Sequence, residues 1–495
     1  LYFQKEEDVM YNYFSNHNHT DVGSNSRFSD SIIRIQDLIN RSIELGYKGV
    51  NISDHECISG FVKFLRHYKE LEQKNGLPEG FKVSLGDEIY LIKDINNIYN
   101  GTEKFWHFLL TAKNYKGFEL IKAISSKAWS NSMTFKGIQR TYITYEQLEE
   151  IIGEDKGNII ATSACLGSYL NDRIFAYFQE GDASAKEDIH EYICWCIDTF
   201  GEENFFLELQ PSSLMNTNQS QRQEFANTKL VLLANAYEIN TVVATDSHYL
   251  EEKHKAFHAS FLKGNEDKGD SRETGDFYDS TYLMDVEEIE RKLLNHLPQE
   301  EVEKAFTNTM KIYDMIEIYE IEKPIVVPRD KHIVENFKVQ HLFKDWYDKC
   351  SDIKQFAYSE EINDRYFLYL VEQGFTKFNQ PFDLEHISRI NIEIHQLIAI
   401  TAKLGEVMSK YYTLVRNLIH NVIWDISLIP PGRGSVAGFY CAYLLEICQI
   451  SAIDYGLPWW RHLHESKVSL ADIDIDTEKA KRGQIFEGMQ EYYGI

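Results

Sequence analysis

Short apolar runs alternate with helical stretches through the first 280 residues, and most of these runs end in a side chain that can bind a metal ion. The runs cover residues 13–15, 49–53, 81–85, 105–110, 158–164 and 241–245. Strands that alternate with helices pair in parallel, and the carboxyl ends of parallel strands meet at one rim. The pattern therefore predicts an α/β barrel with its functional site at that rim.

The side chains at or near the ends of these runs form a mixed set of nitrogen, oxygen and sulfur donors. They are His17, His19, His55, Glu88, His107, Cys165, Asp246 and His248. Such a set suits Zn²⁺ or Mn²⁺ better than Mg²⁺ alone. Each residue taken singly is weak evidence, because buried histidines and cysteines are common in protein cores without a metal ion. Their collective placement favours a metal site.

A glycine-rich loop lies near the end of the chain. The sequence Gly-Arg-Gly-Ser at 432–435 stands just before a helix that the sequence predicts over Val436–Ile447. The backbone N–H groups at the start of a helix attract phosphate oxygens, and Arg433 adds a positive charge there. The loop is therefore a candidate phosphate-binding site.

An acidic run follows the glycine-rich loop. Asp472, Asp474 and Asp476 alternate with two isoleucines, which predicts a strand over Val468–Asp476 with all three carboxylates on one face. Carboxylates at this spacing repel one another unless a cation lies between them, and Mg²⁺ prefers carboxylate oxygens. A phosphate-binding loop with metal-binding carboxylates is the minimum equipment for nucleotidyl transfer by two metal ions.

The charge balance is strongly acidic. Lysine and arginine total 51 residues and aspartate and glutamate total 77, which gives a net charge of −26. This sign is wrong for a protein that binds DNA through its whole surface. Either binding is confined to clefts neutralised by metal ions, or the basic DNA-binding parts lie outside this chain. We favour the second explanation in part.

Other features of the composition fit a large enzyme of the cytoplasm. The seven cysteines are scattered and odd in number, which fits a reducing compartment better than a disulfide framework. No run of 18 or more apolar residues exists, so no membrane span is expected. Residues 1–4 match the tail of a common protease-cleavage tag and are excluded from fold reasoning.

The last part of the chain resembles the palm of the C-family DNA polymerases, which are the bacterial polymerase III alpha subunits and their phage relatives. The matching segments, in family order and spacing, are 430–438, 454–457 and 467–476. The resemblance implies that Asp474 and Asp476 are catalytic and hold two Mg²⁺ ions, that Arg433, Gly434 and Ser435 bind the incoming nucleotide, and that Asp472 orients its neighbours. Ala471 stands where the family usually has proline.

The first part resembles the polymerase-and-histidinol-phosphatase (PHP) domain, which precedes the palm in this family. The matching segments are 17–20, 53–56, 86–88, 107–114, 163–167 and 245–249. The resemblance implies nine ligands around up to three Zn or Mn ions. Eight of them are the residues named above, with His107 and Asp246 in catalytic roles. The ninth is an aspartate soon after His19, for which Asp30 fits best and Asp21 is a rival.

The resemblance also predicts the division of the chain. We expect a tag remnant and leader over 1–9, a distorted (β/α)7 PHP barrel over 10–285, a helical connector and the start of the palm over 286–410, and an α+β palm over 411–495. In the family the third catalytic aspartate, the thumb and the fingers come later in sequence. We therefore expect this chain to lack them.

The resulting hypothesis is a DNA-templated DNA polymerase whose PHP domain acts as a metal-dependent 3′–5′ proofreading exonuclease. Its expected partners are primer-template DNA and deoxynucleoside triphosphates, with a sliding clamp or other replisome subunits joining through C-terminal parts. Its expected location is the bacterial cytoplasm, or the host cytoplasm if it is phage-encoded. Two alternatives remain open: a stand-alone PHP phosphoesterase that acts on a small phosphate ester, and a non-catalytic PHP scaffold.

Overall fold

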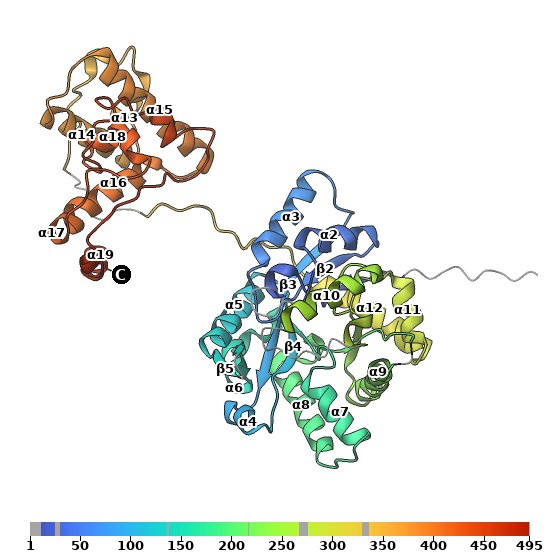
Figure 1. Ribbon diagram of the computed structural model, residues 1–495. Coiled ribbons are helices and arrows are strands. Elements are labelled where there is room, and N and C mark those ends of the chain that lie inside the picture. The colour runs from blue at the N-terminus through green and yellow to red at the C-terminus, as the bar shows by residue number, and fades with distance from the viewer. Residues whose placement is uncertain are drawn as a thin grey trace, which may run out of the picture. The chain divides into compact units, whose positions relative to one another are not determined.

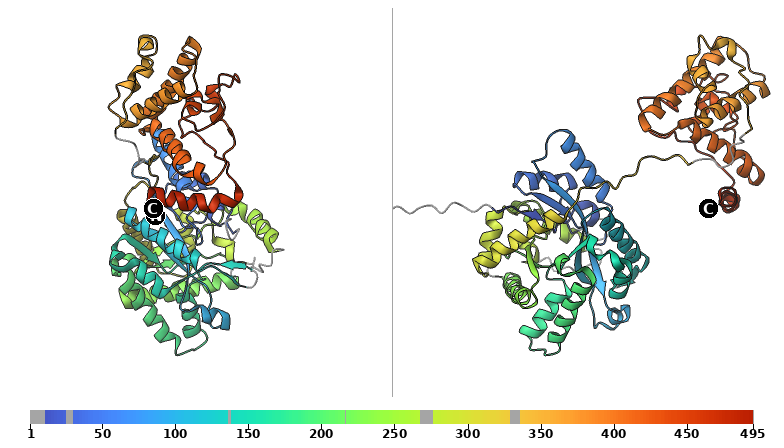
Figure 2. Two further views of the ribbon diagram at one scale, coloured as in Figure 1. Left: turned by 90° about the vertical axis from the view of Figure 1, so that its left-hand side faces the viewer. Right: turned by 180° about the vertical axis from the view of Figure 1, so that it is seen from behind.

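The computed structural model describes residues 11–24, 30–135, 138–215, 217–266, 276–328 and 336–494. The chain divides after Glu322 into two compact units, unit 1 (Leu1–Glu322) and unit 2 (Lys323–Ile495). Figure 1 shows the helices and strands of each unit, and each unit has its own core of buried apolar side chains. Figure 2 shows the same two units from two further directions. Each unit is therefore described by itself.

A nearly closed sheet forms the centre of unit 1. Its strand order is β1-β2-β3-β4-β8-β9-β10, and β7 pairs with β3. The strands are β1 (Phe14–Ser15), β2 (Gly49–Ile52), β3 (Lys82–Ile92), β4 (Trp106–Ala112), β7 (Ile143–Thr144), β8 (Ile159–Thr162), β9 (Phe205–Leu209) and β10 (Asn240–Val243). A parallel bridge between Asn18 and Ser247 joins the segments that follow β1 and β10. The predicted α/β barrel is confirmed.

Strand β4 departs from the parallel pairing that the sequence predicted. It runs antiparallel to both of its neighbours, β3 and β8. The remaining neighbours along the sheet are parallel. Because β4 is reversed, its first residues lie at the rim where the other strands end. This explains why His107 stands at the start of its strand, where it pairs with Tyr90 of β3.

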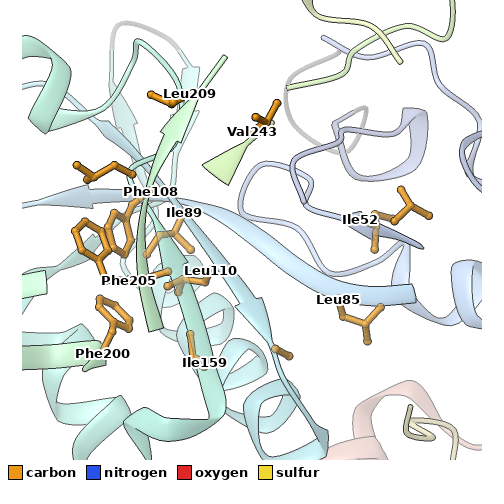
Figure 3. Packing of buried hydrophobic residues seen from close by; sticks show 14 of the residues in the cluster. Ile52, Leu85, Ile89, Phe108, Leu110, Ile159, Phe200, Phe205, Leu209 and Val243 are labelled. Atoms are coloured by element: carbon orange, nitrogen blue, oxygen red, sulfur yellow. The ribbon is translucent and has the colours of Figure 1, made fainter. Parts of the chain in front are cut away.

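Helices pack on the outside of the sheet (Figure 1). They include α2 (Ile35–Glu44), α3 (Phe61–Gln73), α5 (Tyr115–Ser130), α6 (Tyr145–Ile152), α7 (Tyr169–Phe178), α8 (Ala185–Phe200), α9 (Asn218–Tyr237), α10 (Lys255–Glu266), α11 (Val286–Leu294) and α12 (Gln299–Met315). The ring centroids of Phe108 on β4 and Phe200 on α8 lie 5.5 Å apart. Figure 3 shows these two side chains beside Phe205 of β9. This layer of helices packs against the outer face of the strands.

The alternation of side chains along β9 separates two apolar clusters. Phe205, Leu207 and Leu209 belong to the large outer cluster under the helices. Phe206 belongs to a small inner cluster with residues of β1, β8, β10 and the end of α12. The next residue on the inner face of β9 is Glu208. The strand therefore points one carboxylate toward the barrel interior.

Helices α11 and α12 belong with the barrel, although the sequence-based boundary lies at 285. Their apolar faces enter the outer cluster through residues such as Ile289 and Phe306. Ile312 and Ile316 complete the inner cluster below β1 and β10. Because α12 packs directly on β1 and β10 and α11 packs against α12, unit 1 extends to Glu322.

Unit 2 is helical in its described part. Its helices are α13 (Ser351–Ala357), α14 (Ile362–Lys377), α15 (Leu384–Leu404), α16 (Met408–Leu418), α17 (Trp424–Ile426), α18 (Tyr440–Leu444) and α19 (Arg482–Tyr493). A π-helical turn, Ile419–Ile423, joins α16 to α17. No described helix of either unit has the length and apolar character needed to cross a membrane.

Two sequence predictions in unit 2 are wrong. The strand predicted over Val468–Asp476 does not form, because no other strand exists in the described part of unit 2 to pair with it. The helix predicted over Val436–Ile447 breaks into a short 3₁₀ turn, Val436–Gly438, and α18. Phe439 between them is extended, and the buried side chain of Glu393 caps the backbone of α18.

Candidate metal centre and palm motifs

The eight predicted metal-binding side chains converge at the rim of the barrel in unit 1. His17 and His19 follow β1, His55 follows β2, Glu88 lies within β3, His107 lies near the start of β4, Cys165 follows β8, and Asp246 and His248 follow β10. Three groups bring their ligand atoms within 4.8 Å of one another: His17, His19 and Asp246; His19, His55 and His248; and His55, Glu88 and His107. Six separate segments thus build one site.

Glu88 lies at the centre of this site. One or the other of its oxygens is 3.5 Å from His17 Nε2, 3.4 Å from His19 Nε2, 2.7 Å from His55 Nδ1 and 3.0 Å from His107 Nδ1. The side chain is 1% exposed. A buried carboxylate with imidazoles around both oxygens would be well placed to hold a metal ion together with them.

Cys165 supplies the sulfur atom of the set. Its Sγ is 3.5 Å from His107 Nδ1 and 3.9 Å from Glu88 Oε1. Burial raises the pKa of Cys165 well above its ordinary value, and the nearby carboxylates of Glu88 and Asp246 raise it further. A thiolate at this position therefore requires a neighbouring cation, and a bound metal ion would provide one.

Asp30 lies in the site, as the better of the two candidates for the ninth ligand. Its Oδ2 is 3.1 Å from His55 Nε2, and its side chain is 5% exposed. Asp21 begins the short helix α1 (Asp21–Ser24), and its backbone N–H donates to the carbonyl of Ile33. The geometry favours Asp30.

The surroundings shift the pKa values of the histidines of the site in different directions. Burial lowers the pKa of His19 well below its ordinary value, and neighbouring His55 adds to this effect. Burial, followed by the charge of His19, lowers the pKa of His248 to about 3. These imidazoles are therefore neutral near pH 7, which is the form that binds a metal ion.

His17 differs from its neighbours. Burial alone would lower its pKa, but the carboxylates of Glu208, Asp246 and Glu88 outweigh burial and raise the pKa well above its ordinary value. Negative charge is thus concentrated around His17. His19 Nδ1, also buried, has no hydrogen-bond partner within the described residues. Excess negative charge and an unpaired donor nitrogen both fit a site built for cations.

Backbone strain is concentrated beside the same ligands. Glu56, Ala164 and Asp246 have φ values of +46°, +55° and +47°, in the left-handed region that residues other than glycine seldom adopt. Glu56 follows His55, and Ala164 precedes Cys165. Such conformations persist only where the surrounding structure enforces them, and they are frequent at functional sites.

The site opens to solvent at His107. Its side chain is 25% exposed, whereas the other seven side chains of the set are buried. A substrate approaching from solvent would therefore meet His107 first.

In unit 2 the fold brings the glycine-rich loop against the acidic run. Arg433 Nη1 lies 3.2 Å from Asp474 Oδ2, and Arg433 Nε lies 3.4 Å from Asp476 Oδ2. Gly434 has a φ of +66°, and a Cβ atom there would lie 3.2 Å from Asp474 Oδ2. A guanidinium group now occupies the space between the two carboxylates. The position therefore favours positive charge, which fits the predicted Mg²⁺ site.

A chain of hydrogen bonds connects the glycine-rich loop to helix α16. Ser435 Oγ is 3.1 Å from His462 Nδ1, and His462 Nε2 is 2.9 Å from the hydroxyl of Tyr412. Burial, aided by the charge of Lys467, lowers the pKa of His462 to about 4. His462 is therefore neutral at pH 7 and ties Ser435 to helix α16.

Sequence reasoning missed both His462 and Glu208. A carboxylate within the otherwise apolar strand Phe205–Leu209 was a usable signal, because an acidic side chain rarely enters a core without a partner. His462 gave no comparable signal, since it lies in an irregular segment outside the segments that resemble the family.

Comparison with known proteins agrees with this geometry. Residues 16–212 match the PHP domain, and residues 360–495 match the bacterial DNA polymerase III alpha NTPase domain. The chain is 39% identical to the probable DNA polymerase YorL of Bacillus subtilis (strain 168) over 97% of its own length and 37% of that protein. The same values hold for a DNA-directed DNA polymerase of Bacillus phage SPbeta.

A more distant relative shows similar coverage. The chain is 26% identical to DNA polymerase III subunit alpha of Aquifex aeolicus (strain VF5), over 94% of this chain and 36% of that protein. The chain thus spans little more than a third of the length of these relatives. The two domain matches and the similarity along nearly the whole chain place it in the family of bacterial and phage DNA polymerase III alpha proteins, with a PHP domain followed by a segment that matches the NTPase domain.

Proposed function

We propose that unit 1 is a metal-dependent 3′–5′ exonuclease in a C-family DNA polymerase. The observation that carries this proposal is the convergence of eight predicted ligands, together with Asp30, on one buried rim site. A site of this size and donor chemistry suits two or three Zn²⁺ or Mn²⁺ ions. In a polymerase, the use for such a site is removal of a misinserted nucleotide from the primer end.

The roles of the residues follow from their positions. His17, His19, Asp246 and their neighbours would hold the ions, and His107 would stand where the phosphodiester enters. When bound, such ions polarise the phosphate and lower the pKa of water. The buried ligands exclude bulk water, and the strained turns at Ala164 and Asp246 fix their directions.

Unit 2 would serve templated nucleotidyl transfer. Asp474 and Asp476 would hold a pair of Mg²⁺ ions, while Arg433, Gly434 and Ser435 would bind the triphosphate of the incoming nucleotide. Primer-template DNA and deoxynucleoside triphosphates are the proposed substrates, a sliding clamp or other replisome subunits are proposed partners, and the cytoplasm of a bacterium or of a phage host is the proposed location.

A comparison of substrates tests the exonuclease proposal. With Mn²⁺, the chain is expected to release nucleotides from the 3′ end of 5′-labelled DNA much faster than it releases phosphate from a small ester, and a chelator is expected to stop the release. The opposite preference would favour the small-ester phosphoesterase. A protein that holds no transition metal by elemental analysis after chelator-free purification would favour the non-catalytic scaffold.

We also expect the 495-residue chain by itself to leave a primer unextended. Arg433 already pairs with Asp474 and Asp476 in this structure, and a net charge of −26 opposes contact with DNA phosphates. The measurement is primer extension with Mg²⁺ and all four deoxynucleoside triphosphates. Templated extension that disappears in Asp474→Ala would contradict this prediction and show that the chain already holds a complete polymerase site.

A further inference from the structure

Glu208 is a buried carboxylate that none of the roles above uses. It lies on the inner face of β9, two residues after Phe206 of the inner cluster, and its side chain is fully buried. An ionised carboxylate in such a place is costly unless hydrogen bonds and charge satisfy it. Its partners therefore show what the residue is for.

Both oxygens of Glu208 are hydrogen bonded. Oε1 lies 2.8 Å from His17 Nδ1 and accepts a hydrogen bond of 2.7 Å from the side-chain amide of Gln210. Oε2 accepts one of 2.7 Å from the hydroxyl of Thr162 on β8. The backbone N–H of Glu208 donates to Ser163 Oγ at 2.9 Å. Donors from β8 and from the segments that follow β1 and β9 thus hold the carboxylate in one orientation.

This arrangement selects one tautomer of His17. A carboxylate accepts but does not donate, so His17 Nδ1 must carry the proton. Nε2 is then the ring nitrogen that can bind a metal ion once it has lost its proton. It lies 3.1 Å from His19 Nε2, 3.3 Å from Asp246 Oδ1 and 3.5 Å from Glu88 Oε1. Nε2, the His17 nitrogen that Glu208 does not contact, is therefore the one that faces the other ligands.

We propose that Glu208 is a positioning residue for the metal site, which fixes the tautomer and ring orientation of His17 so that Nε2 binds the ion. Gln210 and Thr162 hold the Glu208 carboxylate in the orientation that this role requires. The inference rests on the proposed metal site but not on the substrate of the enzyme. Carboxylates behind metal-bound histidines act in this way in other sites, and their loss typically lowers metal affinity about 10- to 100-fold.

Direct metal titration of the 495-residue protein tests the proposal. Mn²⁺ affinity is measured for wild type, Glu208→Ala and Glu208→Gln, and Co²⁺ absorption in the visible range reports the ligand geometry. Glu208→Ala is expected to bind about 10- to 100-fold more weakly with an altered Co²⁺ spectrum. Glu208→Gln is expected to keep most of the affinity, because its amide oxygen still accepts from His17 and its amide nitrogen donates to Thr162.

Asn308→Ala is the control for general loss of packing. The Asn308 side chain is buried and donates to the carbonyl of Thr241, away from the ligands. This variant is expected to melt at a lower temperature yet keep the wild-type affinity and Co²⁺ spectrum. If Glu208→Ala does not fold, Thr162→Val carries the test, with a smaller loss of affinity expected because one of the hydrogen bonds to Glu208 disappears.

The outcomes separate the two proposals. Wild-type affinity and spectrum in a folded Glu208→Ala, or in Thr162→Val if the first variant does not fold, would overturn the role of Glu208. Equal losses in the Ala and Gln variants would also overturn it, because they would point to charge alone. A wild type that binds Mn²⁺ but releases no nucleotide from DNA would overturn only the exonuclease, whereas a wild type that binds no metal would overturn both.

Discussion

Asp246→Ala is expected to slow the release of nucleotides from the 3′ end of DNA by about a thousandfold or more. Asp246 Oδ1 lies 3.3 Å from His17 Nε2, 3.1 Å from His19 Nε2 and 3.6 Å from His248 Nδ1, so one carboxylate serves three imidazoles. Removing a ligand from a multinuclear site costs several kcal/mol of transition-state stabilisation, and about 4 kcal/mol corresponds to a factor of a thousand. His107→Ala is expected to have a comparable effect.

The measurement is single-turnover cleavage of a 5′-labelled single strand at saturating Mn²⁺. Asp198→Ala, which removes an exposed carboxylate from α8 of the same unit, is the matched control and is expected to cleave at the wild-type rate. If Asp246→Ala and His107→Ala both keep the wild-type rate while retaining the wild-type melting temperature, the rim site is not the nuclease site.

Glu393→Ala is expected to destabilise unit 2 by about 3–5 kcal/mol. The Glu393 side chain is fully buried and accepts hydrogen bonds from the backbone N–H groups of Tyr440 and Cys441 and from Nε of Arg389. Arg389 Nη2 in turn donates to the carbonyl of Gly438. Truncation would leave a largely buried guanidinium without its carboxylate and two helix-start N–H groups without an acceptor.

Denaturant unfolding of the whole protein, with hydrogen exchange resolved by mass spectrometry, measures this effect. Exchange in α18 and in the 430–438 loop is expected to accelerate, while exchange in the barrel strands stays unchanged. Glu385→Ala, which removes an exposed carboxylate from α15, the helix that also holds Glu393, is the control. A loss of stability no greater than that of the control would show that Glu393 does not hold the loop.

Much of the barrel site could be predicted from the sequence because its ligands sit next to their strands. A residue two or three positions after a short buried strand, such as His55 or Cys165, must lie at the rim regardless of how the helices pack. The direction of β4 could not be predicted, because alternating strands and helices imply parallel pairing, whereas β4 runs antiparallel to β3 and β8. The choice between Asp30 and Asp21 stayed open because loop residues follow no period.

Unit 2 was less predictable for a related reason. The alternation of Asp472 to Asp476 has the period of a strand, but a strand forms only where another backbone offers hydrogen bonds. The break before α18 depends on Glu393, whose burial no local pattern reveals. The contact of Arg433 with Asp474 and Asp476 likewise arises from tertiary structure, although the sequence indicated that both segments belong to one site.

The bridge between Asn18 and Ser247 has a consequence for how this protein is made. His19 and Asp246, which meet beside it, are 227 positions apart in the chain. During synthesis, a ribosome must deliver all of the barrel strands before the first and last of them can meet, and contacts this distant form slowly. Metal binding at the proposed site would then be among the last events of barrel assembly. A nascent chain that binds an ion tightly would therefore already contain all of the barrel strands. A chain stalled before β10 would leave its histidines exposed, and they would bind ions only weakly.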